Sequence, residues 1–178
     1  NNDVANSRKR RSFCKSIDLD YSLDATDYDA SELSVGEQLS GNKIFSAYDW
    51  LKSRNEEIKR NDRALEKMFN LNPQDTDVDP YKVMNLWEAY KKRHNLVDFN
   101  DMLYGVLRLN KIPDAKVMIM DEFQDTSPLD YEVYKLWRDD MEKVYLAGDP
   151  AQCIYEFRGA RPTYLVNENN NGVAFGNY

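Results

Sequence analysis

The sequence predicts an α/β fold for its C-terminal part, and three features carry this prediction. The apolar run Lys116–Met120 ends directly in two acidic residues, and a second apolar run, Lys143–Ala147, ends in Gly148-Asp149. Continuous apolar runs of this length are typical of parallel strands that are buried on both faces. A helical pattern lies between the runs, so that strand, helix and strand form one βαβ unit.

The helix between the two runs has a clear start. Ser127 is a good N-cap, Pro128 suits the first helical position, and Asp130 can complete a capping box. The residues expected to face the sheet are Leu129, Val133, Leu136 and Trp137.

The N-terminal part is predicted to be mostly helical. Residues 1–42 are polar and predict loops or a short helix. The basic run Arg8–Arg11, followed by Lys15, is interpreted as a solvated chain end, with a nucleic-acid patch as the less favoured alternative. From residue 44 onward apolar residues recur at helical spacing, namely Ile44, Tyr48, Leu51, Ile58, Leu65, Met68 and Phe69.

Two further helices are expected before the first strand. One follows Pro80 and ends near His94, with Lys91–Arg93 at its end, where cations suit the helix dipole. Its predicted apolar face consists of Val83, Leu86, Trp87 and Tyr90. The other has Asp98 as its N-cap and an apolar face of Phe99, Met102, Leu103, Val106 and Leu107. Trp50, Trp87 and Trp137 are expected to anchor the core.

Composition excludes several classes of protein. The 178 residues carry a net charge of -7, which argues against a general nucleic-acid-coating protein, because such proteins usually present a basic surface. No apolar run is long enough to cross a bilayer, and we expect neither a membrane partner nor a signal peptide. Cys14 and Cys153 form no metal-binding pattern and fit a reducing compartment, so the cytoplasm is the expected location.

The first segment whose side chains could bind a ligand or catalyse a reaction is Asp121–Ser127, with the sequence DEFQDTS. Acids that follow a parallel strand lie at the carboxyl edge of the sheet, where α/β folds bind ligands. There Asp121 can hold Mg²⁺ through an oxygen, and Glu122 can deprotonate an attacking water, as nucleoside triphosphate hydrolysis requires. The alternative is an acidic turn that only caps the next helix.

The second segment, AGDPAQCIYEFRGA, also begins where an apolar strand ends. Gly148 allows a tight turn beside a ligand, and Gln152 can bind a phosphate or the attacking water. Tyr155 and Phe157 offer flat faces for unpaired bases, and Arg158 can bridge carboxylate or phosphate groups. The alternative is a loop whose aromatic residues pack into the core.

Together the two segments resemble motifs II and III of the UvrD/Rep family of superfamily 1 DNA helicases. A weaker match, Leu96–Leu103, is similar to the segment just upstream of motif II in that family. The resemblance implies part of a RecA-like parallel sheet, of the P-loop NTPase type, over residues 96–166, and a mostly helical inserted subdomain of the 1B type over residues 1–95. Residues 167–178 are expected to form a flexible tail.

The resemblance also implies roles for individual residues. Asp121 would hold Mg²⁺, Glu122 would be the general base, and Gln152 would sense the terminal phosphate of ATP. The nucleotide site would further include Gln124, Asp125 and Asp149. Tyr155, Phe157 and Arg158 would lie between the ATP site and single-stranded DNA. Members of the family use Mg-ATP to move along single-stranded DNA, typically 3′ to 5′, and to unwind duplex DNA.

Two departures limit what the chain is expected to do alone. Cys153 stands where the family usually has serine, a small change. More importantly, no GxxxxGKS/T loop occurs in the sequence to hold the phosphates. We therefore expect a fragment that is inactive without the remaining helicase domains. A degenerate, non-enzymatic interaction module and part of a helicase–nuclease subunit are the alternatives.

Overall fold

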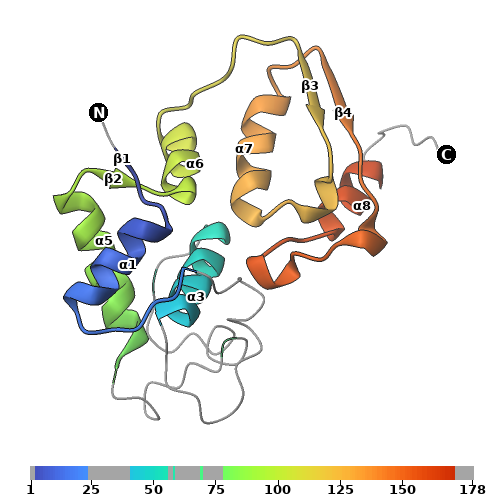
Figure 1. Ribbon diagram of the computed structural model, residues 1–178. Coiled ribbons are helices and arrows are strands. Elements are labelled where there is room, and N and C mark those ends of the chain that lie inside the picture. The colour runs from blue at the N-terminus through green and yellow to red at the C-terminus, as the bar shows by residue number, and fades with distance from the viewer. Residues whose placement is uncertain (1–2, 24–40, 56–57, 59–68, 70–77, 171–178) are drawn as a thin grey trace. The chain divides into compact units, whose positions relative to one another are not determined.

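The computed structural model describes residues 3–23, 41–55, 58, 69 and 78–170 (Figure 1). Of the helical pattern predicted from residue 44 onward, Ile44, Tyr48 and Leu51 lie in the described helix α3, whereas Leu65 and Met68 fall outside the described residues. The helices and strands of the described part are β1 (Asp3–Val4), α1 (Ser7–Ser16), α3 (Gly41–Ser53), α5 (Pro80–Arg93), β2 (Leu96–Val97), α6 (Phe99–Arg108), β3 (Val117–Met120), α7 (Pro128–Arg138), β4 (Lys143–Leu146) and α8 (Thr163–Asn170). Three short 3-10 helices are η1 (Phe123–Asp125), η2 (Pro150–Gln152) and η3 (Glu156–Arg158).

The chain divides into two compact units. The first contains Asn1–Lys52 and Glu56–Met102, and the second contains Ser53–Asn55 and Leu103–Tyr178. The predicted boundary between residues 95 and 96 therefore falls inside the first unit. The reason is local: Leu96 pairs with Asp3 in a parallel pair of short strands, which ties β2 to the N-terminal segment.

The first unit is held together by aromatic packing among α1, α3 and α5. Phe13 of α1, Phe45 of α3 and Trp87 of α5 are almost fully buried, and Trp87 contacts both phenylalanine rings. The predicted helix after Pro80 is confirmed. The side chain of Asp79 accepts hydrogen bonds from the first two backbone N–H groups of α5 that need capping, and His94 lies at its C-terminal cap.

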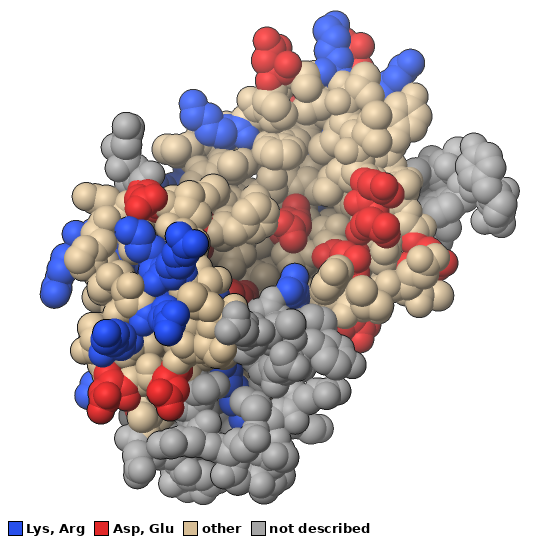
Figure 2. All heavy atoms as spheres, in the orientation of Figure 1, with Lys and Arg blue, Asp and Glu red and all other residues tan. Residues whose placement is uncertain are grey.

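The basic run lies within α1 and is not simply a solvated end. Figure 2 shows Lys and Arg side chains gathered over α1 and the adjoining α5. Arg10, however, points inward and forms a two-pronged ion pair with Asp49 of α3, at 2.7 and 2.6 Å. Lys9 pairs with Asp3 at 3.1 Å. Two of the four basic residues therefore take part in holding the first unit together.

Three details of the predicted helix faces are wrong. Leu86 was placed on the buried face of α5 but is 42% exposed, whereas its neighbour Met84 is buried. Phe99 and Met102 of α6 are also exposed. Lys91, one of the basic residues that the sequence places at the helix end, is buried because two carboxylates surround it. Helical spacing identifies an apolar stripe but not the direction in which the next element packs.

The second unit contains the predicted strand–helix–strand arrangement, and the α/β fold class is confirmed. β3 and β4 pair in parallel, with Val117 opposite Lys143 and Met120 opposite Leu146. Between them, α7 begins as predicted: Ser127 is its N-cap, Pro128 occupies the first turn, and Asp130 completes a capping box. The core of this unit consists of Met118, Phe123, Tyr134 and Leu165, with Trp137 packed against it.

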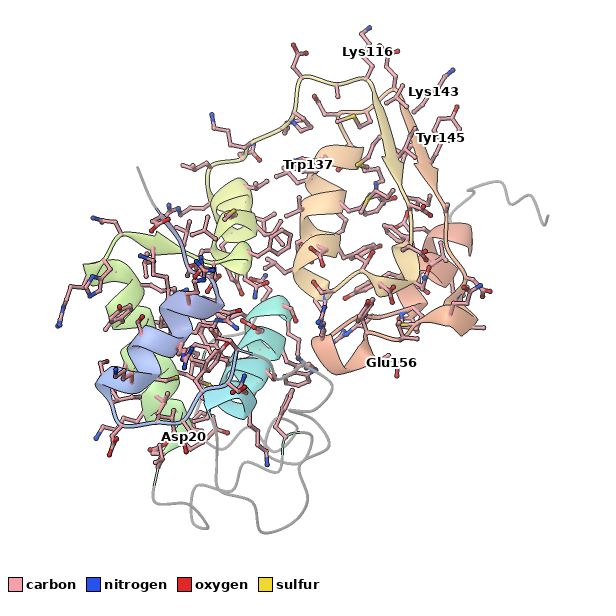
Figure 3. The ribbon with its side chains drawn as sticks, in the orientation of Figure 1. Asp20, Lys116, Trp137, Lys143, Tyr145 and Glu156 are labelled. Atoms are coloured by element: carbon pink, nitrogen blue, oxygen red, sulfur yellow. The ribbon has the colours of Figure 1, made fainter. Side chains whose placement is uncertain are left out.

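The expectation that both faces of the strands are buried is wrong for the described part of the chain. Ile119 is 74% exposed and Tyr145 is 54% exposed. Successive side chains of a strand point to opposite faces, and α7 covers only one of them. Figure 3 shows Tyr145 pointing away from α7, whereas Trp137 lies on the other side of the strand pair.

The predicted flexible tail begins too early. Asn167 and Glu168 lie in helix α8, and Glu168 is buried. Residues 171–178 lie outside the described part. Among the described residues, no helix is both long and apolar enough to span a membrane.

Candidate functional site

The two candidate functional segments, DEFQDTS and AGDPAQCIYEFRGA, leave the strand pair at the same edge. β3 ends at Met120 and β4 at Leu146. The ladder continues one step further, because the N–H of Ala147 donates to the carbonyl of Met120 at 2.8 Å and the N–H of Phe123 donates to the carbonyl of Ala147 at 2.9 Å. Asp121 and Glu122 therefore lie beside the turn that contains Gly148 and Asp149. Figure 2 shows acidic side chains gathered over this end of the strands.

The two acids that follow β3 are exposed and available. Asp121 accepts a hydrogen bond from the N–H of Glu122 at 2.9 Å. Glu122 adopts a left-handed backbone, with φ 52° and ψ 39°, which a residue with a side chain enters only at a cost in energy. Neither carboxylate forms an ion pair with any Lys or Arg in the described part. Negative charge is thus left free at the edge of the sheet.

Gln124 connects the two segments. Its side chain is buried, with 1% exposed. The amide Nε2 donates to Glu122 Oε2 at 2.6 Å, and the amide Oε1 accepts from the N–H of Asp149 at 3.0 Å. One amide therefore fixes the carboxylate after β3 and the backbone after β4 at the same time.

Gly148 makes this contact possible. A Cβ at this position would collide with Gln124 Oε1 and would approach the backbone N of Phe123 to 3.0 Å. Because the second neighbour is backbone, it cannot move aside by rotating a bond. Glycine is required here so that the two strand ends can approach each other.

The turn after β4 is organised by Asp149. This residue caps η2: its Oδ1 accepts from the N–H of Ala151 at 2.9 Å, and its Oδ2 accepts from Gln152 Nε2 at 2.8 Å. The hydrogen bond from Gln152, followed by that from Ala151, holds the pKa of Asp149 below its usual value. Gln152 is thereby connected to the edge through Asp149 and Gln124.

Comparison with known proteins now identifies the chain. The family described as UvrD/REP helicase N-terminal domain matches residues 5–172. The chain belongs to the UvrD/Rep helicase family. The resemblance expected from the DEFQDTS and GDPAQCIYEFRGA segments is therefore confirmed.

The relatives of this UvrD/Rep-family chain include proteins named as ATP-dependent DNA helicases and as a subunit of the RecBCD enzyme. It is 31% identical over 133 residues to the ATP-dependent DNA helicase srs2 of Schizosaccharomyces pombe, covering 70% of this chain and 15% of that protein. It is 34% identical over 90 residues to the ATP-dependent DNA helicase Rep of Escherichia coli, covering 46% of this chain and 13% of that protein. It is 32% identical over 112 residues to the RecBCD enzyme subunit RecB of Buchnera aphidicola, covering 56% and 9%. The chain thus spans a small part of the length of each relative.

The remaining predicted residues of motif II and motif III are placed less completely. Asp125 packs behind the edge, and its Oδ1 is buried with no hydrogen-bond partner among the described residues. Burial raises the pKa of the Cys153 thiol; a backbone hydrogen bond at Tyr155 opposes this rise, and the carboxylate of Asp125 reinforces it. Cys153 therefore stays protonated at neutral pH, as the hydroxyl of serine would.

The predicted DNA-facing residues lie on and before η3. The guanidinium of Arg158 lies over the ring of Tyr155, 5.1 Å from its centre, and both side chains are exposed. Gly159 ends this turn with φ 95°, a conformation that favours glycine. The side chain of Phe157 lies outside the described part. The structure thus places an aromatic ring and a cation together on the motif III segment.

The donor set at the edge suits magnesium. No group of three or more His, Cys, Asp or Glu side chains suitable for a metal occurs in the described part. Mg²⁺ does not need one, because it usually binds one or two protein carboxylates and takes its other ligands from water and phosphate. Exposed oxygens on Asp121 and Glu122, with no cation of their own, fit that requirement.

Sequence reasoning missed one residue of this unit, Glu168. It lies in an Asn-rich stretch, which gave no signal of burial. A usable signal exists elsewhere, since Tyr131 and Tyr134 stand one helical turn apart on α7 and need buried acceptors for their hydroxyl groups.

Proposed function

We propose that, in the full-length protein, this edge of the sheet hydrolyses Mg-ATP and uses the energy to move along single-stranded DNA, 3′ to 5′, and to unwind duplex DNA. The observation that supports this most is the bridge from Glu122 through Gln124 to Asp149. It joins the Glu122 carboxylate of motif II to the turn of motif III, as a site that couples hydrolysis to movement needs.

The roles we propose follow from position. Asp121 would hold Mg²⁺, which when bound neutralises charge on the phosphates. Glu122 would accept the proton of the attacking water, since its carboxylate is exposed and forms no ion pair with a described Lys or Arg. Gln124 would orient that carboxylate through its hydrogen bond to Oε2. Asp125 lies within the same motif and would complete the nucleotide site.

Coupling to DNA would run through motif III. Asp149 holds Gln152 on the turn, where the amide can respond to the terminal phosphate. The same segment continues to Tyr155, Phe157 and Arg158, whose aromatic and cationic groups suit stacking on unpaired bases and contact with the backbone phosphates. A shift of the turn on hydrolysis would therefore move the DNA-facing residues.

The chain is not expected to turn over ATP by itself. The 178 residues contain no GxxxxGKS/T loop, so the phosphates of ATP lack their main backbone cradle here. The remaining helicase domains are therefore the partners required for activity, together with single-stranded and duplex DNA.

The test is Glu122→Gln in the full-length protein. We expect steady-state ATP hydrolysis to fall by about 10²- to 10⁴-fold, because a general base is lost. Affinity for ATP should stay nearly unchanged, since the amide keeps the size and one oxygen of the carboxylate. Hydrolysis is measured by phosphate release, and affinity by titration with a fluorescent ATP analogue.

The matched control is Glu142→Gln, the same substitution at the opposite end of the strand pair, where Glu142 is exposed and forms an ion pair with Lys116. This variant should hydrolyse ATP at the wild-type rate. Wild-type turnover in Glu122→Gln would remove Glu122 from the role of base.

Two alternatives remain distinct proposals. The missing phosphate loop favours a non-enzymatic interaction module, and sequencing the whole gene decides it: a gene without a GxxxxGKS/T element would support the module. The similarity to the RecBCD enzyme subunit RecB favours part of a helicase–nuclease subunit. That version requires a nuclease domain elsewhere in the same gene.

A further inference from the structure

Helix α8 packs against the motif III turn. Leu165 of α8 is 2% exposed and belongs to the core that contains Phe123 of motif II. Its Cδ2 would lie 3.1 Å from a Cβ at Gly148, so the leucine packs directly against the backbone of the turn. The position of α8 therefore decides where the turn can lie.

Glu168 fixes α8 to the helix that follows motif II. Its buried carboxylate accepts hydrogen bonds from Tyr131 Oη at 2.6 Å and from Tyr134 Oη at 3.0 Å. Arg138 Nη1 donates to both carboxylate oxygens at 3.2 Å. All three partners belong to α7, and these four side chains are called the Glu168 network below.

Other contacts keep α8 in the same register. The rings of Tyr164 and Tyr131 are stacked, with their centres 4.0 Å apart and 3° between their planes. The N–H of Arg161 donates to the carbonyl of Thr126 in motif II at 2.9 Å. The helix after motif III and the helix after motif II therefore behave as one support.

Both tyrosine hydroxyls of the Glu168 network stay protonated at neutral pH. Burial raises the pKa of Tyr134 to about 12, and the nearby Glu168 carboxylate adds to the rise. Burial and the hydrogen bond to Glu168 also raise the pKa of Tyr131. Both phenols therefore remain donors, and the carboxylate is satisfied only while α8 keeps its place on α7.

We infer that Glu168 is a positioning residue for the DNA stimulation of the proposed ATP hydrolysis: it anchors α8 on α7, and through Leu165 it holds the motif III turn that leads to Tyr155 and Arg158. A buried acceptor with three donors has one good arrangement, and any slip of α8 leaves donors unpaired. Because α8 cannot shift, a movement of the strand edge during hydrolysis moves the segment that carries Tyr155 and Arg158. This inference rests on the proposed function.

The test compares DNA-stimulated and unstimulated ATP hydrolysis in the full-length protein carrying Glu168→Gln. The amide keeps the shape but loses the charge and one acceptor oxygen. We expect kcat at saturating single-stranded DNA to fall by about three- to thirtyfold, the range in which a residue along a coupled network acts. KM for ATP and the unstimulated rate should change by less than about twofold, because Glu168 does not touch the nucleotide edge.

Two further variants make the result specific. Tyr131→Phe removes one donor but keeps the ring that stacks on Tyr164, so it should lower the same quantity by a smaller factor. The double variant should fall no further than Glu168→Gln alone, because both changes break one network. Glu132→Gln on α7 is the matched control and should match the wild type, because Glu132 pairs with Lys135 and lies outside the Glu168 network.

The outcomes separate the two claims. A lowered melting temperature in Glu168→Gln with an unchanged ratio of stimulated to unstimulated hydrolysis would show a merely structural residue and overturn the inference. Should Glu168→Gln not fold, Tyr131→Phe decides by the same ratio. A folded wild-type protein without ATP hydrolysis would instead refute the proposed function.

Discussion

The two units of this chain use carboxylates in opposite ways. In the first unit, Asp98 and Asp101 are gathered around Lys91, whose Nζ lies 2.6 Å from an oxygen of each. In the second unit, Asp121 and Glu122 are exposed at the edge of the strand pair, with no cation from the described part of the chain. The difference shows that the nearby charge, and not the residue type, decides whether an acid stabilises the fold or is free for chemistry.

The Lys91 network is satisfied by its own hydrogen bonds, with Lys91, Tyr48 and Asp98 buried. Lys91 also donates to the hydroxyl of Tyr48 at 2.7 Å, and that hydroxyl donates to Glu88 at 2.6 Å. Burial alone would raise the pKa of Asp98, but the Lys91 ammonium and its hydrogen bond outweigh burial and hold that pKa below its usual value. These carboxylates are neutralised from within and leave nothing for an incoming cation.

The variant expected to lower stability most is Lys91→Met, which removes the buried cation of the first unit. It removes the nearest cation from the buried Asp98 and the partly buried Asp101. We expect the free energy of unfolding to fall by about 3–5 kcal/mol, measured by urea denaturation of the chain.

Lys92→Met is the matched control, because Lys92 is the exposed neighbour on α5. It should change the free energy of unfolding by less than about 0.5 kcal/mol. Equal losses in the two variants would show that the first unit does not depend on its buried charges.

A smaller effect is expected at the open edge, from Gly148→Ala. The new Cβ collides with Gln124 Oε1 and crowds the backbone of Phe123. We expect a loss of about 1–3 kcal/mol in stability from overpacking. In the full-length protein, ATP hydrolysis should also fall, because Gln124 can no longer bridge Glu122 and Asp149.

Gly105→Ala in α6 is the control, since a Cβ there meets nothing within 4 Å. Alanine favours a helix over glycine by about 0.5–1 kcal/mol, so this variant should be as stable as the wild type or more so. If Gly105→Ala were less stable than the wild type and Gly148→Ala were equally stable, our assignment of Gly148 as the constrained glycine would be wrong.

The smallest effect is expected from pH near neutrality. The lowered pKa of Asp98 means that its contribution to stability is complete above its unfolded value and is lost as pH falls through the folded one. Burial would lower the pKa of Lys91, but Asp98 and the hydrogen bonds raise it, so its contribution is lost only as pH rises above the ordinary 10.5. The free energy of unfolding should therefore be flat between about pH 5 and about pH 10 and fall on either side. Urea denaturation across this range checks it, and a maximum below about pH 4 would contradict the ion-pair account.

Much of the second unit follows from residues that are close in sequence. The N-cap at Ser127, the capping box with Asp130 and the two apolar runs were all predictable, because a cap needs only its own first turn and a strand only its own side chains. The order of acids, amide and glycine in DEFQDTS and GDPAQCIYEFRGA identified the family for the same reason. The placement of both segments at one edge followed from the parallel pairing of β3 and β4.

The sequence by itself determined the local features of the chain: where its helices start, where its strands lie, and which residues identify a UvrD/Rep-family member. The tertiary structure alone decided which charges are buried and which are available. Glu168 meets Tyr131 across 37 positions and Lys91 meets Tyr48 across 43. Burial of a charged group depends on partners that only the folded chain brings together, so no local sequence pattern predicts it.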